Sequence, residues 1–216
     1  MRSSAPRHLD WSNCLPNLPS HEVFVDDKPG LRVSETTLAK SGLYTGKALD
    51  ERVIEQIVQA DARERAHQVA VNFISYRPRS SKEILDKLAR KGFTRELALE
   101  VVDQLKELNL LNDLHFARMF VRDKLRGKPM GKAMLRRKLL EKGIAFQLSE
   151  PVLKEYVTEE KEQEAAKALA ERKMKMSHSR FSALDPLAKK KRLIDYLLSR
   201  GFSQDIATKT VRSIIR

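Results

Sequence analysis

A dense run of basic side chains between residues 118 and 142 is the strongest candidate for chemistry in this sequence. It contains ten lysines and arginines and only two acids, a net charge of +8 over 25 residues. Arg118, Arg122 and Arg126 are spaced by four, so a helix would place them in one stripe. Such a stripe presents positive charge to an extended, negatively charged partner, such as nucleic acid or an acidic protein groove. The candidate contact residues are Arg118, Arg122, Arg126, Lys128, Lys132 and Arg136.

Residue patterns for catalysis or for holding a cofactor are absent from the sequence. The segment 127–133 resembles a phosphate-binding loop, but it is one residue short, and Ala133 stands where a hydroxyl would bind Mg²⁺. The five histidines have no histidine four residues away and no cysteine companion, so the sequence predicts no zinc site. No serine lies in the G-x-S-x-G context of a nucleophile. We therefore expect a protein that is not an enzyme and uses no metal or other cofactor.

The composition excludes several classes of protein. The chain has 216 residues, a formal net charge of +13, 41% hydrophobic residues and 6% aromatic residues. The apolar content suffices for hydrophobic cores, while the low aromatic content argues against a β-sandwich or β-barrel. No apolar run is long enough to cross a membrane, no secretory signal is evident, and Cys14 is the single cysteine. We expect a cytoplasmic, monomeric protein that has no membrane partner.

The two ends of the chain differ in character. Half of the eight prolines lie in the first 29 residues, and residues 1–20 are predicted to form a disordered leader. In the N-terminal extension, residues 21–56, the β-prone pieces 21–25 and 31–33 flank a turn sequence and favour a small β-hairpin. From about Asp50 onward, apolar residues recur at intervals of three and four, which indicates helices almost throughout.

A helix–Gly–helix unit occurs three times and can be aligned on Gly92, Gly143 and Gly201. Apolar residues stand eight and four positions before each glycine, and one, five, ten and thirteen positions after it. A base directly precedes each glycine. This pattern predicts a helix that ends at a glycine with positive φ, followed by a second helix. We therefore expect an all-α fold of three tandem three-helix repeats in an elongated, curved array. The expected repeats are residues 57–111, 112–157 and 158–216.

The second repeat departs from this pattern at its third helix. Ala145 stands where Thr94 and Ser203 would cap the corresponding helices, and Pro151 lies inside the expected helix. Because proline is tolerated in the first turn of a helix, we expect this helix to start late. Ser149 would then be its cap.

Four short sequences in the middle of the chain resemble the RecX family of bacterial regulatory proteins. They are N-D-x-x-F-A at 112–117, F-V-R at 120–122, K-P-M-G at 128–131 and L-x-x-K-G-I at 139–144. Residues 38–46, 76–80 and 91–93 resemble the first segment of that family, and the resemblance covers roughly residues 30–216.

The resemblance implies tandem three-helix repeats that bind the RecA recombinase and lodge in the groove of the RecA–DNA filament. A protein bound there would restrain filament growth, ATP hydrolysis, strand exchange and co-protease activity. It would therefore act in DNA recombination, DNA repair and the SOS response. On this basis, the six bases named above are the expected contacts with the filament. The other matched residues, Phe116, Ala117, Gly131, Gly143 and Ile144, are expected to serve packing and turns.

Two other functions stay open at this point. Three-helix modules with a glycine turn resemble helix-turn-helix units, so the basic stripe could bind DNA directly. Against this, the aligned third helices begin with Glu96 or Asp205 and lack a clear set of side chains for reading bases. The other alternative is a helical adaptor whose charge is only a solvated helix face.

Overall fold

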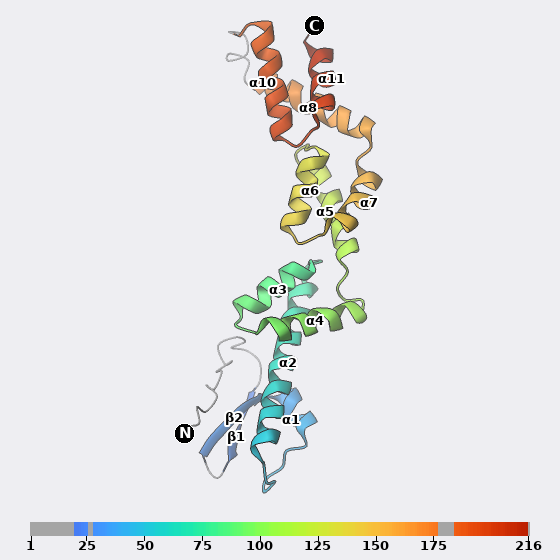
Figure 1. Ribbon diagram of the computed structural model, residues 1–216. Coiled ribbons are helices and arrows are strands. Elements are labelled where there is room, and N and C mark those ends of the chain that lie inside the picture. The colour runs from blue at the N-terminus through green and yellow to red at the C-terminus, as the bar shows by residue number, and fades with distance from the viewer. Residues whose placement is uncertain (1–19, 26–27, 177–183, 216) are drawn as a thin grey trace, which may run out of the picture. The chain divides into compact units, whose positions relative to one another are not determined.

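The computed structural model describes residues 20–25, 28–176 and 184–215 (Figure 1). These residues are mainly helical, and their β-structure is a single two-stranded sheet. The predicted all-α class with a small N-terminal hairpin is confirmed. The elongated, curved arrangement stays a prediction. The predicted leader, residues 1–20, lies outside the described residues except for Ser20, which begins the first strand.

The chain divides into two compact units, and the first is Met1–Leu111. In Figure 1 the hairpin and α1 lie beside the N-terminal part of α2, while α3 and α4 pack on its C-terminal part. The long helix α2 therefore belongs to two small hydrophobic cores. The elements of this unit are β1 (Ser20–Val25), β2 (Lys28–Ser34), α1 (Glu35–Ser41), α2 (Glu51–Ser75), α3 (Ser81–Arg90) and α4 (Arg95–Glu107).

The hairpin is held to α2 by apolar packing and by one buried carboxylate. Leu31 and Val33 of β2 form a core with Ile57 of α2. Beside this core the Asp61 carboxylate accepts the backbone N–H of Ser34 at 2.7 Å. The same carboxylate is paired with the buried Arg65, one turn further along α2. A buried charge is tolerated where it is paired and hydrogen-bonded, so Asp61 fixes the end of β2 against the helix.

Module 1 consists of α2, α3 and α4, and its core comes from all three helices. Helix α3 begins with a capping box: the Ser80 hydroxyl accepts the backbone N–H of Glu83, and the Glu83 carboxylate accepts the N–H of Ser80. These bonds satisfy N–H groups that have no partner within the helix. The buried apolar side chains are Ala66, Val69, Ala70, Ile84, Leu88, Phe93, Ala98, Val101, Val102, Leu105 and Leu111.

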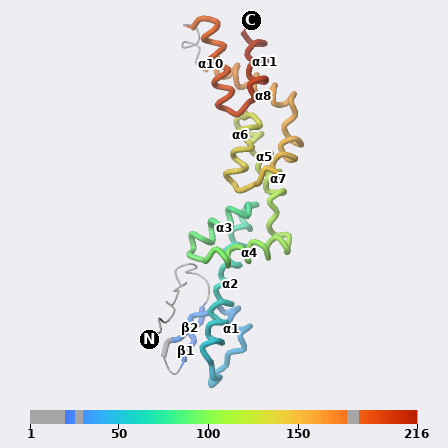
Figure 2. The backbone as a smooth tube through the Cα atoms, viewed as in Figure 1, coloured from blue at the N-terminus to red at the C-terminus, as the bar shows by residue number. Residues whose placement is uncertain are grey.

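The second compact unit, Asn112–Arg216, contains two further three-helix groups, each with its own core. Module 2 consists of α5, α6 and α7, and module 3 of α8, α10 and α11. Figure 2 shows the backbone of module 3, in which all three helices contact one another. The elements are α5 (Asp113–Arg126), α6 (Lys132–Glu141), α7 (Phe146–Tyr156), α8 (Glu159–Met176), α10 (Pro186–Ser199) and α11 (Gln204–Ile214).

The three aligned glycines form the same turn, as the repeat predicted. Gly92, Gly143 and Gly201 have φ values of 85°, 80° and 85°. In each case the N–H of the following residue donates to the carbonyl four residues before the glycine, at 3.0–3.2 Å. The following residue is always apolar and buried, so the turn both closes one helix and anchors the next. These buried residues are Phe93, Ile144 and Phe202.

The expectation of a late start for the third helix of module 2 is wrong. Helix α7 begins at Phe146, three residues after its glycine, as α4 and α11 do after theirs. Ala145 occupies the N-cap position, and its side chain makes no capping hydrogen bond. Ser149 is not a cap, because its hydroxyl is inside the helix and donates to the carbonyl of Phe146. The repeated glycine turn determines where the helix starts, and the helix accepts an internal Pro151 and the lack of a side-chain cap.

Modules 2 and 3 are joined by direct backbone hydrogen bonds. Gly131, before α6, donates its N–H to the carbonyl of Arg200 at 2.9 Å, and Ala133 donates to that of Gly201 at 3.1 Å. Helix α6 has no side-chain cap of its own, and the carboxylate of Glu162 in α8 accepts the N–H of Lys132 at 2.7 Å. The first turn of α6 is therefore capped by the next module.

We expect Gly131→Ala to destabilise this junction. A Cβ atom at Gly131 would overlap the backbone carbonyl of Gly201, so one of the two segments must move. The expected loss is about 2 kcal/mol in the free energy of unfolding, with faster hydrogen exchange at the N–H of Ala133. Urea denaturation and hydrogen exchange on the full chain would measure both effects.

The matched control is Gly127→Ala, in the same loop. Gly127 has φ −87° and ψ −134°, a backbone conformation that alanine does not favour, while a Cβ there makes an ordinary contact at 3.5 Å. This change should cost only local backbone strain, about 1 kcal/mol, and leave hydrogen exchange at the N–H of Ala133 unaltered. Equally fast exchange at Ala133 in the two variants would contradict the tight junction.

Candidate functional site

Helix α5 places three of the six predicted contact residues in one stripe. Arg118, Arg122 and Arg126 follow one another at successive turns of the helix. Its opposite face is held by Phe116 and Val121, which lie in the core of module 2. The core side thus fixes the rotation of α5 and directs the arginine face away from the module.

The stripe is only partly open to a partner. Arg118 pairs with Glu155 of α7 at 3.1 Å, although both side chains are about half exposed. Arg122 contacts the sulfur of Met119 within its own helix, and Arg126 and Lys128 are exposed. Within the described residues, no carboxylate pairs with Arg122, Arg126 or Lys128. We call these three residues the open basic limb.

The remaining two bases converge on one carboxylate. Lys132 and Arg136 of α6 both pair with Glu150 of α7, the lysine at 3.3 Å. The Glu150 side chain is only 16% exposed. Its hydrogen bond from Arg136 is the largest effect lowering the pKa of Glu150, and the hydrogen bond from Lys132 adds to it, against a smaller opposing effect of burial. We call Lys132, Arg136 and Glu150 the Glu150 cluster.

Glu150 was missed by the sequence analysis, because its partners lie on another helix, 14 and 18 residues earlier. Pairs three or four residues apart can be seen within a helix, but pairs across a helical hairpin depend on how its helices pack. The structure therefore divides the six predicted bases. Arg122, Arg126 and Lys128 are available for a partner. Arg118 pairs with Glu155 of α7 at the surface, and Lys132 and Arg136 join α6 to α7 through Glu150.

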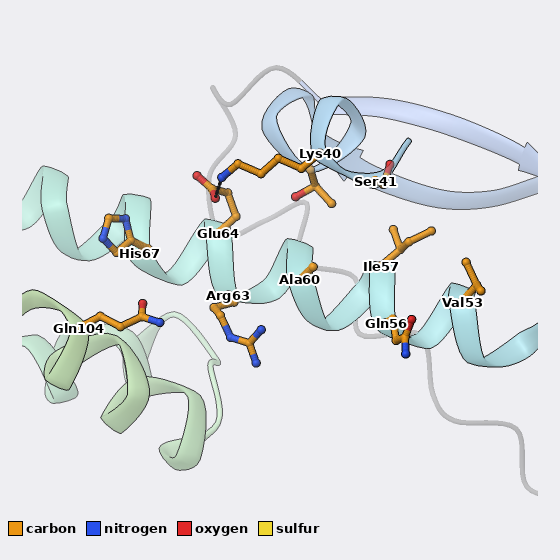
Figure 3. Close-up of a pocket in the computed structure, with 11 residues that line it drawn as sticks. Lys40, Ser41, Val53, Gln56, Ile57, Ala60, Arg63, Glu64, His67 and Gln104 are labelled. Carbon is orange, nitrogen blue, oxygen red and sulfur yellow. Dashed lines mark hydrogen bonds and ion pairs between the residues drawn. The ribbon is translucent and has the colours of Figure 1, made fainter. Parts of the chain in front are cut away.

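A pocket of about 560 Å³ opens between α1, α2 and α4 in the first unit (Figure 3). Val53, Ile57 and Ala60 of α2 form part of its lining. The ion pair between Lys40 of α1 and Glu64 of α2, at 3.1 Å, belongs to the lining as well. None of the sequence-predicted contact residues lines this pocket. Its lining holds one histidine, His67, and no pair of groups arranged as a nucleophile and its base.

The described residues contain neither a metal-binding cluster nor a membrane-spanning helix. Within the ranges that the structure describes, no three His, Cys, Asp or Glu side chains gather closely enough to hold a metal ion. None of the helices in the described part of the chain combines the length and apolar content that a membrane span requires. The basic surface of module 2 is the candidate site.

Comparisons with known proteins find relatives over most of the chain. Family models described as the first, second and third three-helix domains of RecX match residues 66–105, 112–153 and 159–211. A regulatory protein RecX from Listeria monocytogenes serotype 4a is 32% identical over 191 residues, which is 88% of this chain and 69% of that protein. One from Lactobacillus gasseri is 37% identical over 140 residues, which is 65% of this chain and 52% of that protein.

Two solved structures are similar as well. A crystal structure of a regulatory protein RecX has a TM-score of 0.74 at 24% identity, covering 90% of this chain and 93% of that one. This likeness concerns the fold alone. A crystal structure of RecX from Lactobacillus salivarius has a TM-score of 0.64 at 28% identity, covering 72% of this chain and 97% of that one.

The Glu150 cluster should contribute to stability, and Glu150→Gln tests this. The amide has no charge and keeps only one of the two acceptor oxygens, so one of the two bases loses its acceptor and both lose their ion pair. We therefore expect the free energy of unfolding to fall by about 1–3 kcal/mol at neutral pH. Because the pKa of Glu150 is lowered in the folded state, its contribution is present above the ordinary value of 4.5 and is lost as the pH falls through the folded pKa. Urea denaturation at several pH values would show the two proteins converging in acid.

Glu155→Gln is the matched control. Glu155 also pairs with an arginine, but both partners are about half exposed, and such pairs contribute little. We expect a loss of less than about 1 kcal/mol, with weak pH dependence. A loss at Glu150 no larger than at Glu155 would show that the cluster is not a stabilising element.

Proposed function

We propose that this protein, which belongs to the RecX family of regulatory proteins, binds the RecA recombinase and the RecA–DNA filament and mainly inhibits them. Bound to the filament, it restrains filament growth, ATP hydrolysis, strand exchange and co-protease activity. It acts in the cytoplasm, in DNA recombination, DNA repair and the SOS response, and has no catalytic activity of its own.

The observation that carries this proposal is the open basic limb. Arg122, Arg126 and Lys128 stand at the end of α5 and in the loop that follows, exposed and without a carboxylate partner among the described residues. Three unpaired bases within seven residues raise the local positive potential and attract an extended anion. A nucleoprotein filament is such a partner, since its DNA is polyanionic and its subunits repeat.

The tandem modules support the same partner. Modules 2 and 3 are joined through Gly131, Gly201 and Glu162, so contacts made by either are presented from one compact unit. Several weak contacts on a rigid molecule add to a high effective affinity where the partner repeats its binding sites. Direct DNA binding would use the same bases, so the experiment must distinguish binding to free DNA from an effect on RecA.

We expect the full-length protein to inhibit DNA-stimulated ATP hydrolysis by the cognate RecA at well below one molecule per RecA monomer. The triple variant Arg122→Ala, Arg126→Ala, Lys128→Ala should need at least about tenfold more protein for half inhibition. The slope of log affinity against log salt concentration should fall by about three, if each base makes one ionic contact. ATPase titrations and filament-binding measurements at several salt concentrations would provide these values.

The control removes the same charge from α8, by Lys161→Ala, Lys167→Ala and Arg172→Ala, all at exposed positions. It should inhibit like the unmodified protein. If both triple variants lose activity equally, net charge rather than the open basic limb is responsible. No effect of the unmodified protein on RecA, with retained binding to free DNA, would favour the direct DNA-binding alternative.

A further inference from the structure

Two large apolar side chains are exposed at one corner of module 2. Leu140 lies one residue before the end of α6 with 65% of its surface exposed, and Phe146 begins α7 with 61% exposed. They stand three positions before and three after Gly143, on either side of the turn. Single exposed leucines are common on protein surfaces, but a leucine and a phenylalanine that flank one turn form a paired apolar surface.

Arg136 lies beside both side chains. It lies one turn before Leu140 on α6, so both occupy the same face of that helix. Its guanidinium carbon is 5.7 Å from the centre of the Phe146 ring, and the same group binds Glu150, one turn after Phe146 on α7. The phenylalanine ring is thus held beside an arginine whose own position is fixed by an ion pair.

The fold does not require an apolar pair at these positions. The sequences of the three repeats can be aligned on their turn glycines, and the turn has the same hydrogen bonds in each module. Neither of the other modules has an aromatic residue at the position of Phe146. The equivalents of Leu140 and Phe146 are Ala89 and Arg95 in module 1, and Leu198 and Gln204 in module 3.

The charged pair behind this corner is also specific to module 2. At the position of Arg136, the other modules have Leu85 and Ile194, which pack against the hydrophobic cores of their modules. At the position of Glu150 they have Leu99 and Thr208. Module 2 therefore has an ion pair between its second and third helices, where module 1 has Leu85, packed against its core, and Leu99, which is 41% exposed. The exposed apolar surface of Leu140 and Phe146 costs stability without a partner, because it stays in contact with water.

We infer that Leu140 and Phe146 form a protein-docking surface for an apolar segment flanked by carboxylates, carried by the RecA protein of the filament. The charge around the pair is net positive and supports an acidic partner. Arg136 and Arg137 pair with Glu150 and Glu141, but these two carboxylates are outnumbered by the four bases of α6, which are Lys132, Arg136, Arg137 and Lys138. An apolar centre with an aromatic residue and a polar, arginine-containing rim is the usual composition of an interface hot spot. This inference rests on the proposed function and names a second contact of a different kind from the open basic limb.

The two contacts should differ in their response to salt. Ionic contacts made by the open basic limb weaken as salt concentration rises. Burial of Leu140 and Phe146 removes apolar surface from water, and this gain does not decrease with salt. A variant of the apolar pair should therefore lower affinity at every salt concentration and leave the salt slope unchanged.

The test is the double variant Leu140→Ser, Phe146→Ser, measured for binding to preformed RecA filaments and to free DNA at several salt concentrations. We expect filament affinity to fall about ten- to a hundredfold, with the same salt slope and unchanged affinity for DNA. The matched control is Phe24→Ser with Leu187→Ser, the same residue types at positions that are 59% and 79% exposed. It should bind like the unmodified protein.

Folding is checked by circular dichroism, and a second variant, Phe146→Leu, keeps an apolar side chain and should retain most of the affinity. If the unmodified protein binds the filament and the double serine variant binds it equally well, this inference is overturned while the proposed function stands. If the unmodified protein does not bind the filament, the proposed function fails, and the partner named here fails with it. If sedimentation shows that the serine variant converts a dimer into a monomer, the surface is covered by a second copy of the chain, which also overturns the inference.

Discussion

The glycine turn between the second and third helices is the constraint on which each module depends. At Gly92, Gly143 and Gly201 a backbone with positive φ lets the next N–H reach back to the end of the preceding helix. The residue after the glycine is then delivered into the core, so a local backbone bond and a buried apolar contact form together. Because this turn sets the start of the following helix, α7 begins at Phe146 although it has neither a side-chain cap nor a favourable residue at position 151.

The same turn also provides the connection between modules 2 and 3. Two backbone N–H groups near the start of α6 donate to the carbonyls of Arg200 and Gly201, and the absence of a side chain at Gly131 is what permits this approach. Glu162 completes the junction by capping the exposed start of α6. The second unit is therefore built by neighbouring repeats that satisfy each other's helix ends.

Module 2 uses the shared framework differently from its neighbours. Its second and third helices are joined by the Glu150 cluster, and its apolar side chains Leu140 and Phe146 are exposed. The open basic limb lies on the preceding helix and loop of the same module. Repeated turns maintain the fold, so the surface of one repeat is free to change without loss of architecture. The concentration of charge and exposed apolar surface in module 2 makes it the centre of the proposed contact with RecA.

The sequence by itself determined the helical class, the three glycine turns, the hairpin and the stripe on α5, because each depends on residues near one another in the chain. Helix periodicity and glycine at positive φ are local properties, so they can be predicted without knowledge of packing. The partners of the charged side chains and the junction between modules 2 and 3 were decided by contacts between helices. Glu150, Glu162 and the close approach of Gly131 to Gly201 join segments 14 to 70 residues apart, and no spacing rule identifies such partners. Which predicted bases are open and which are paired therefore follows only from the tertiary structure, because a charge is neutralised by what lies beside it in space.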